Sequence, residues 1–243
     1  MKLTADDLRT FASDGYVVVK GVVPEELLVA ADEEIERLLA AEPAPRDADW
    51  HMYFKTPARL AACDAALWAS GAVEVANQLV APHSLDHALD HIQIALNMPG
   101  WRHVPGGPHI DCQTGDEAGS FTMLAAVYLC DETKPASGNL WVWPGSHWAH
   151  AQLFAERGRD VLLANGGHAT MLDPPLALAP PIPVLAKRGD LLLAHFLLGH
   201  NRGGNETDKM RRIIYYRLAT PGHDARRRDF LVDPLLEYSP LVS

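Results

Sequence analysis

The tripeptide His109-Ile110-Asp111 combines the residue types and the spacing that a metal-binding site needs. In a β-strand, residues i and i+2 point to the same face, so both side chains can reach one ion from the same side. An imidazole together with a carboxylate suits Fe(II), Mn(II) or Zn(II). Because such a short pattern also arises by chance, a metal site here requires a third ligand from elsewhere in the chain.

His200 is the best candidate for the third ligand. It follows the apolar run 190–198 and precedes the turn-forming sequence Arg202-Gly203-Gly204-Asn205. Two histidines and one carboxylate make the facial triad of non-haem Fe(II) oxygenases, which leaves positions open for a co-substrate and oxygen. His195 is a rival, but its odd separation from His200 places it on the opposite strand face. We therefore expect His195 to be a packed histidine.

Two arginines, Arg211 and Arg212, begin the next apolar run. A buried arginine can bind a carboxylate through two parallel hydrogen bonds, as a dicarboxylic co-substrate such as 2-oxoglutarate requires. Neighbouring strand residues point to opposite faces, so one of the two would face the site. The residues alone leave open which one does so, and they also fit two surface arginines at a strand start.

Polar residues on earlier strands are candidates for contacts with a keto acid. Gln93 and Asn97 are four residues apart on the strand before His109, so they share a face and their amides can donate hydrogen bonds. The polar edge of a solvent-facing strand would give the same pattern. Thr122 is a weaker candidate for the same role.

The elements that must position these residues change character near Pro82. Before it, Thr4-x-x-Asp7 predicts a capped helix to about Ser13, residues 16–20 a short strand, and Pro24 the start of a second helix. After it, short strand-like runs separated by turn residues indicate a sandwich or barrel, and the segregated helices argue against an alternating α/β fold. The predicted strands are His91–Asn97, Pro108–Cys112, Phe121–Cys130, Asn139–Trp143, Val184–Ala186, Asp190–Leu198 and Arg211–Ala219.

The length of 243 residues fits one domain with a sizeable core. We expect a helical N-terminal part over 1–82 and a β-rich core over 83–220. An insertion would occupy 148–180 of that core, and a C-terminal tail would follow over 221–243.

The composition excludes several classes of protein. The net charge of −10 repels phosphate backbones, so a nucleic-acid partner is not expected. No apolar stretch approaches the roughly 20 residues that span a bilayer, and no secretory start is visible. The three cysteines form no spaced pair, which suits a reducing compartment. We expect a cytoplasmic protein with a small-molecule substrate and no membrane partner, and the oligomeric state stays open.

Longer motifs extend this pattern through the chain. About thirty residues after His109-x-Asp111 comes the block Gly138-Asn139-Leu140-Trp141-Val142-Trp143-Pro144-Gly145-Ser146-His147. His200 follows Asp190 of a Gly-Asp pair by ten residues, and Asn205 and Arg211 follow His200 by five and eleven. Over roughly residues 10–220 this arrangement resembles the phytanoyl-CoA dioxygenase family of Fe(II)/2-oxoglutarate oxygenases.

This resemblance implies a double-stranded β-helix, a cupin-like jelly roll, flanked by α-helices. It implies that His109, Asp111 and His200 bind Fe(II), and that Arg211 pairs with the distal carboxylate of 2-oxoglutarate, with Arg212 as the alternative. The activity it implies is a dioxygenase that uses O2, hydroxylates a small metabolite and releases succinate and CO2. Halogenation is disfavoured, because Asp111 fills the position that a halide would need.

Some features depart from the resemblance or allow other functions. Many members of the family carry a small hydroxyl residue two positions after the distal histidine, where this chain has Arg202. His147 more plausibly tethers the Pro-Gly turn than binds metal. A Zn(II) hydrolase on the same barrel is one alternative, since two histidines and a carboxylate also suit hydrolysis. A catalytically silent sensor is the other.

Overall fold

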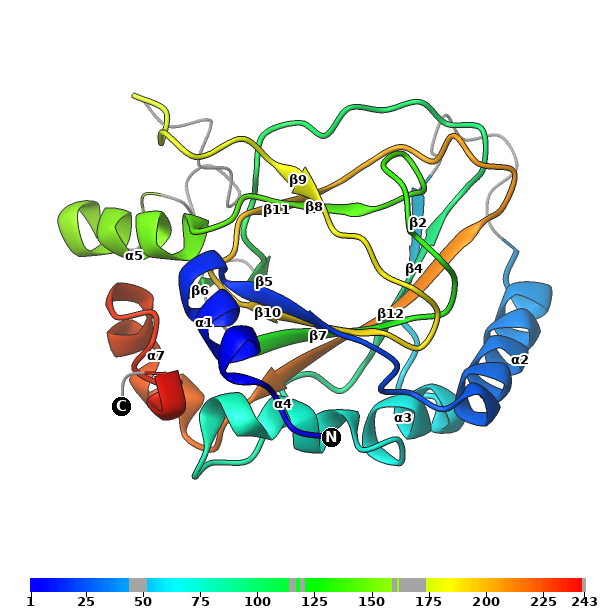
Figure 1. Ribbon diagram of the computed structural model, residues 1–243, viewed down its shortest axis with the longest axis horizontal. Helices are drawn as coiled ribbons and strands as arrows, with labels where there is room; N and C mark the ends of the chain where they lie inside the picture. The colour runs from blue at the N-terminus through cyan, green and yellow to red at the C-terminus, as the bar shows by residue number, and fades with distance from the viewer. Residues whose placement is uncertain (44–51, 114–116, 119–120, 159–160, 162–173, 242–243) are drawn as a thin grey trace.

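The computed structural model describes residues 1–43, 52–113, 117–118, 121–158, 161 and 174–241 (Figure 1). Much of the expected insertion at 148–180 therefore lies outside the described residues. The helices are α1 (Ala5–Asp14), α2 (Glu25–Ala41), α3 (Ala61–Trp68), α4 (Ala72–Val80), α5 (Ser146–Arg157), α7 (His223–Val232) and the short 3-10 helix η2 (Ser239–Leu241). Among the described residues, no helix is long and apolar enough to cross a membrane.

The strands form antiparallel sheets. The largest has the order β1-β10-β7-β12-β4-β2, with β3 pairing β12, and a small sheet has the order β11-β8-β9. Strands β5 and β6 pair separately. The large-sheet strands are β1 (Tyr16–Val19), β2 (Met52–Lys55), β3 (Asp86–His87), β4 (Gln93–Asn97), β7 (Met123–Tyr128), β10 (Leu191–His195) and β12 (Arg211–Ala219). The others are β5 (Cys112–Gln113), β6 (Glu117–Ala118), β8 (Leu140–Val142), β9 (Ile182–Pro183) and β11 (His200–Arg202).

Both faces of the large sheet are buried, and alternation along each strand sorts the side chains between them. On β12, Ile214 and Tyr216 pack into a core with residues of α2, α3 and α4. Ile213 and Tyr215 belong to a second core, which includes residues of the small sheet. In Figure 1, α3 and α4 lie below the large sheet, and β8, β9 and β11 lie above it.

The first helix confirms its sequence signature. The backbone N–H of Asp7 donates to the Thr4 hydroxyl at 3.1 Å, and the N–H of Thr4 donates to the Asp7 carboxylate at 2.8 Å. The helix ends at Asp14, one residue later than predicted, and its C-cap is Gly15, which has φ 83°. A Cβ at Gly15 would lie 2.6 Å from Nδ1 of His147, so glycine suits both the backbone and the packing here.

Four predicted strands are shorter at one or both ends in the structure, and two others are displaced along the chain. Within 108–112, His109 forms an isolated bridge to His200, and regular strand pairing begins only at Cys112. In place of a strand at 184–186, Ile182–Pro183 pairs with β8, and Ala186 makes an isolated bridge to Glu132. By contrast, β12 has the predicted bounds.

The segment expected as a C-terminal tail is packed against the sheet. It forms α7 and η2 and buries Phe230, Leu231 and Tyr238. The Tyr238 hydroxyl donates to the carbonyl of Thr122 at 2.6 Å, next to the end of β7. This segment is therefore part of the domain core.

Buried histidines predict that acid destabilises the fold. Burial lowers the pKa of His150 from 6.5 to about 4, even though its Nδ1 donates to the carbonyl of Leu197. The unfolded state then binds more protons below pH 6.5, so stability is lost as pH falls from 6.5 towards 4. The loss from this histidine is about 2 kcal/mol at pH 5.

Urea unfolding at pH 7 and pH 5 measures this effect. In His150→Gln, the difference in unfolding free energy between the two pH values should shrink by about 2 kcal/mol. The variant His83→Gln, at an exposed position, should leave that difference unchanged. An equal pH dependence in all three proteins would contradict the assignment.

Candidate active site

A backbone pairing brings His109 and His200 together across a large sequence separation. The N–H of His109 donates to the carbonyl of His200 at 3.1 Å, and the N–H of His200 donates back at 3.0 Å. The two imidazole centroids are 4.5 Å apart. His200 begins β11, whose pairing with β8 holds it in turn. The geometry of this pair is therefore fixed by the main chain.

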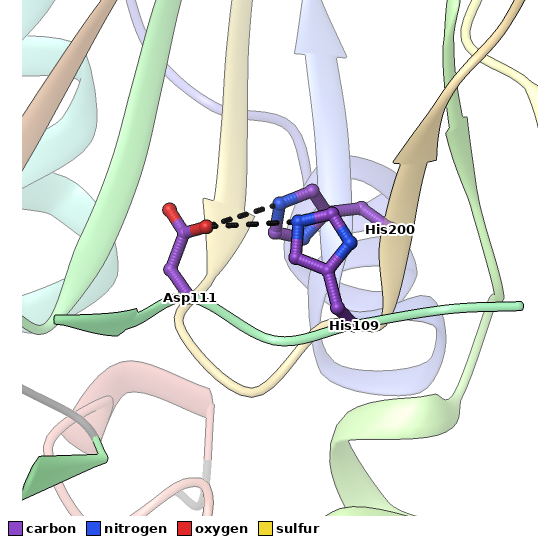
Figure 2. Close-up of side chains that lie close together, drawn as sticks. All are labelled: His109, Asp111 and His200. Carbon is purple, nitrogen blue, oxygen red and sulfur yellow. Dashed lines mark ion pairs between the residues drawn. The ribbon is translucent and has the colours of Figure 1, made fainter. Parts of the chain in front are cut away.

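Asp111 completes a three-residue cluster that could hold a metal ion (Figure 2). Its Oδ1 lies 3.5 Å from Nε2 of His200 and 3.9 Å from Nε2 of His109. One ligand atom from each residue lies within 4.8 Å of the other two. Metal bonds from histidine nitrogen and carboxylate oxygen are about 2.1 Å long, so one ion fits between these three atoms. The structure thus brings together the three predicted ligands.

Hydrogen-bond partners outside the cluster orient two of the three ligands, Asp111 and His200. Arg217 donates from Nη2 and Nε to Oδ2 of Asp111, at 2.6 and 3.2 Å, which leaves Oδ1 facing the histidines. The Nδ1 of His200 lies 3.0 Å from the carbonyl of Leu198. Since a carbonyl only accepts, Nδ1 carries a proton, so Nε2 is the atom that would bind a metal once its own proton is lost.

Charge also keeps Asp111 ready to bind a cation. Burial by itself would raise the pKa of Asp111, but Arg217, His200 and His109 outweigh burial and hold that pKa well below its usual range. Burial lowers the pKa of His200, yet the hydrogen bond and charge of Asp111 outweigh it and raise that pKa. Asp111 is therefore ionised at neutral pH.

Arg217 should matter for metal affinity although it is not a ligand. Replacing it with glutamine leaves Oδ2 of Asp111 without its charged donor, and loss of such a partner typically costs 10- to 100-fold in affinity. Calorimetric titration with Mn(II) should show a loss of about that size. Arg212→Gln is the matched control, because Arg212 lies on the opposite face of the same strand. Unchanged Mn(II) affinity in Arg217→Gln would refute this role.

The cluster lies in a cavity of about 560 Å³, a size typical of small-molecule sites. Three of its lining residues are apolar: Phe54, Leu124 and Leu140. The remaining lining residues are polar, charged or small: Gln93, His103, Gly106, His109, Asp111, His200, Asn201, Arg202, Tyr215 and Arg217.

The two arginines that begin β12 point in opposite directions in the structure. Arg212 pairs with Glu36 and Asp32 of α2, so the alternative in which it faces the site is wrong. Arg211 points to the interior and is 2% exposed. Its Nε donates to Glu132 at 2.8 Å and its Nη2 donates to the hydroxyl of Tyr215 at 2.9 Å. It does not line the cavity itself, whereas Tyr215 does.

The three polar candidates have separate places. Gln93 lines the cavity, and its Oε1 lies 3.4 Å from Nη2 of Arg217. Asn97 is buried opposite Arg211 in the β4–β12 register and donates to the carbonyl of Gly203 at 2.8 Å. Thr122 is away from the cavity, which corrects the prediction, because its hydroxyl bonds Glu237 and His223 of the C-terminal segment at 3.0 Å each.

Two histidines excluded as ligands are structural residues, as predicted. In His195, Nδ1 accepts from the N–H of Leu197 at 2.9 Å and Nε2 donates to the carbonyl of Pro234 at 2.6 Å. His147 is buried, and its Nε2 lies 3.2 Å from the carbonyl of Ala12, so it joins α5 to α1.

Sequence reasoning missed Arg217. A signal was available: residues 211, 213, 215 and 217 share one face of a strand, and within β12 Arg217 is the other charged residue on that face. The even spacing from Arg211 therefore places a second positively charged side chain on the same face of β12.

An antiparallel β fold with two histidines and one carboxylate clustered in a cavity defines a class of candidate metal-dependent enzyme. The model of the phytanoyl-CoA dioxygenase (PhyH) family matches residues 11–213. The chain belongs to this family. A search of curated proteins finds no match.

Solved structures share the fold at low sequence identity. The α-ketoglutarate-dependent epimerase SnoN from nogalamycin biosynthesis is 21% identical, with a TM-score of 0.66 over 88% of this chain and 82% of SnoN. HygX from Streptomyces hygroscopicus, solved with nickel and 2-oxoglutarate, is 20% identical, with a TM-score of 0.61 over 91% and 88%. The carbocyclase SnoK, also from nogalamycin biosynthesis, is 17% identical, with a TM-score of 0.58 over 93% and 90%.

Proposed function

We propose that this protein is a non-haem Fe(II)/2-oxoglutarate-dependent dioxygenase with a jelly-roll core. It would hydroxylate a small-molecule metabolite and release succinate and CO2. The observation that carries the proposal is the cluster of His109, Asp111 and His200 in a cavity of the phytanoyl-CoA dioxygenase fold. The ligands reported for HygX and the co-substrate of SnoN support the same cofactors here.

The three residues of the cluster would hold Fe(II) from one side and leave three positions open. Bound Fe(II), with 2-oxoglutarate and O2, supplies the oxidising chemistry. Arg217 fixes Asp111 so that one oxygen faces the ion, which keeps the remaining positions for the co-substrate and oxygen. Phe54, Leu124 and Leu140 give the cavity apolar lining, which would limit water around the reacting C–H bond.

Arg211 is the proposed anchor for the distal carboxylate of 2-oxoglutarate. It faces the interior beside Tyr215, and its Nη1 has no hydrogen-bond partner among the described residues. A buried guanidinium nitrogen without a partner fits a carboxylate ligand. Gln93, on the cavity wall, is the nearer candidate for a contact with the keto-acid end.

Hydroxylation is one of several outcomes that this cofactor set allows. SnoN is an epimerase and SnoK is a carbocyclase, although both share the fold. We favour hydroxylation as the default reaction because it needs no further residue to divert the oxidation. Product analysis with a substrate would separate hydroxylation from epimerisation and ring closure.

The test is an anaerobic titration of metal-free protein with Fe(II) and then 2-oxoglutarate, monitored by visible absorption. A charge-transfer band should appear when both are present and should be missing in His109→Ala. Succinate release on admitting oxygen would then follow turnover. Tight metal binding with no band would favour a hydrolytic Zn(II) site, and no metal binding would favour a sensor.

A further inference from the structure

A second group of buried polar side chains surrounds Arg211, whose Nη2 donates to the hydroxyl of Tyr215 on the lining of the cavity. Glu132 is fully buried, and its Oε1 accepts from Nε of Arg211 at 2.8 Å. Asn97 lies opposite Arg211 in the strand register, and Tyr128 on β7 lies opposite Ile213. A Cβ at Gly138 would lie 2.9 Å from Cβ of Arg211, so the backbone packs tightly against the aliphatic part of this side chain.

This group has more hydrogen-bonding capacity than it uses. Within the described part of the chain, Nη1 of Arg211, Oε2 of Glu132, the hydroxyl of Tyr128 and Oδ1 of Asn97 have no partner. Buried polar atoms in native proteins are almost always hydrogen-bonded, and each exception requires an explanation. Four exceptions around one ion pair point to a polar group that enters from outside.

The charges restrict what that group can be. Arg211 is already neutralised by Glu132, so a second carboxylate would leave a net negative charge in a buried place, which is costly. Binding of one proton by Glu132 would remove this net negative charge and the cost of burying it. A protonated Glu132 would donate to an incoming carboxylate, and Arg211 Nη1 and the Tyr128 hydroxyl would donate to it as well.

We propose that Glu132 binds the distal carboxylate of 2-oxoglutarate as a neutral acid, and that co-substrate binding therefore takes up one proton from solvent. This inference rests on the proposed function. It makes Glu132 a direct contact of the co-substrate, together with Arg211. It also makes co-substrate affinity depend on pH.

The surroundings of Glu132 leave it as the group that changes protonation. Arg211 and Tyr215 face it from β12, and Tyr128 and Cys130 face it from β7 and its end. Burial raises the pKa of both tyrosines and raises the pKa of Cys130 to about 11, so all three stay neutral near pH 7. Burial raises the pKa of Glu132 by more than Arg211 lowers it.

Proton uptake can be measured without turnover. Calorimetric titration of the Ni(II)-loaded protein with 2-oxoglutarate, in two buffers of different ionisation enthalpy, should show close to one proton taken up. Affinity should fall as pH rises, by up to about tenfold per pH unit. 2-Oxobutyrate, which has the same keto-acid end but no distal carboxylate, should bind with no uptake. No proton uptake with 2-oxoglutarate would overturn the proposal.

A pair of adjacent variants assigns the proton. In Glu132→Gln, the side-chain amide can donate a hydrogen bond without first taking up a proton from solvent. Proton uptake and the pH dependence of 2-oxoglutarate affinity should therefore both disappear. Asp131→Asn is the control, because Asp131 is exposed and accepts a hydrogen bond from the backbone N–H of Arg188. Proton uptake and the pH dependence should both persist in this variant. Uptake that persists in Glu132→Gln would overturn the proposal. If that variant does not fold, the comparison of the two keto acids in the native protein decides. Metal binding with no 2-oxoglutarate binding at any pH would instead overturn the proposed function.

Discussion

Replacing His200 with alanine should abolish metal binding at working concentrations, and turnover with it. The variant loses one of three ligands, whereas loss of an outer-sphere partner alone typically costs 10- to 100-fold. We therefore expect Mn(II) or Fe(II) affinity to fall by more than about 100-fold. Calorimetry gives the affinity directly, and the charge-transfer band with 2-oxoglutarate should be absent.

His103→Ala is the matched control for this variant. His103 lines the same cavity, where it stacks on Trp101 at 4.5 Å, but it is not in the three-residue cluster. It should keep native metal affinity. If His200→Ala bound Fe(II) as tightly as the native protein, the ligand assignment would be wrong.

Replacing Arg211 with alanine should weaken 2-oxoglutarate binding while the metal stays bound. Truncation of a buried, hydrogen-bonded charge partner costs 2–5 kcal/mol, so the dissociation constant should rise on the order of 100-fold. The same change leaves Glu132 buried without its cation, and the fold should lose about 3–5 kcal/mol. Titration of the Ni(II)-loaded variant with 2-oxoglutarate measures the first effect, and urea unfolding measures the second.

Two comparisons separate binding from stability in this variant. 2-Oxobutyrate has no distal carboxylate, so its affinity should be the same in Arg211→Ala and in the native protein. Arg212→Ala removes the neighbouring arginine, which pairs with α2, and should leave 2-oxoglutarate affinity unchanged. Equal loss of both keto acids in Arg211→Ala would show general damage to the site and not a lost anchor.

Sequence-based prediction is most accurate where functional residues follow the two-residue alternation of a β-strand. The spacing of His109 and Asp111 pairs them, and β12 has the predicted bounds because two arginines are followed by a run that is apolar apart from Arg217. The choice between Arg211 and Arg212 needed the observed register, because alternation says that they differ but not which one is inside.

Contacts between distant segments had no such signal. Thr122 bonds residues that lie 101 and 115 positions later in the chain, so nothing near it indicated that its hydroxyl was occupied. Glu132 meets Arg211 across 79 positions, from the turn after β7. Such contacts depend on how distant strands pair and on how the C-terminal segment packs against the sheet. Short sequence patterns carry no information about either.

The reciprocal backbone hydrogen bonds between His109 and His200 have a consequence for the metal-free protein. Because folding itself brings these two ligands together, an arriving ion need not organise a mobile chain, and little conformational entropy remains to be lost on binding. In zinc fingers, by contrast, the binding energy of the metal drives folding. This protein should therefore fold first and load later, so that chelators strip its ion without unfolding it and different divalent ions exchange on one unchanged scaffold.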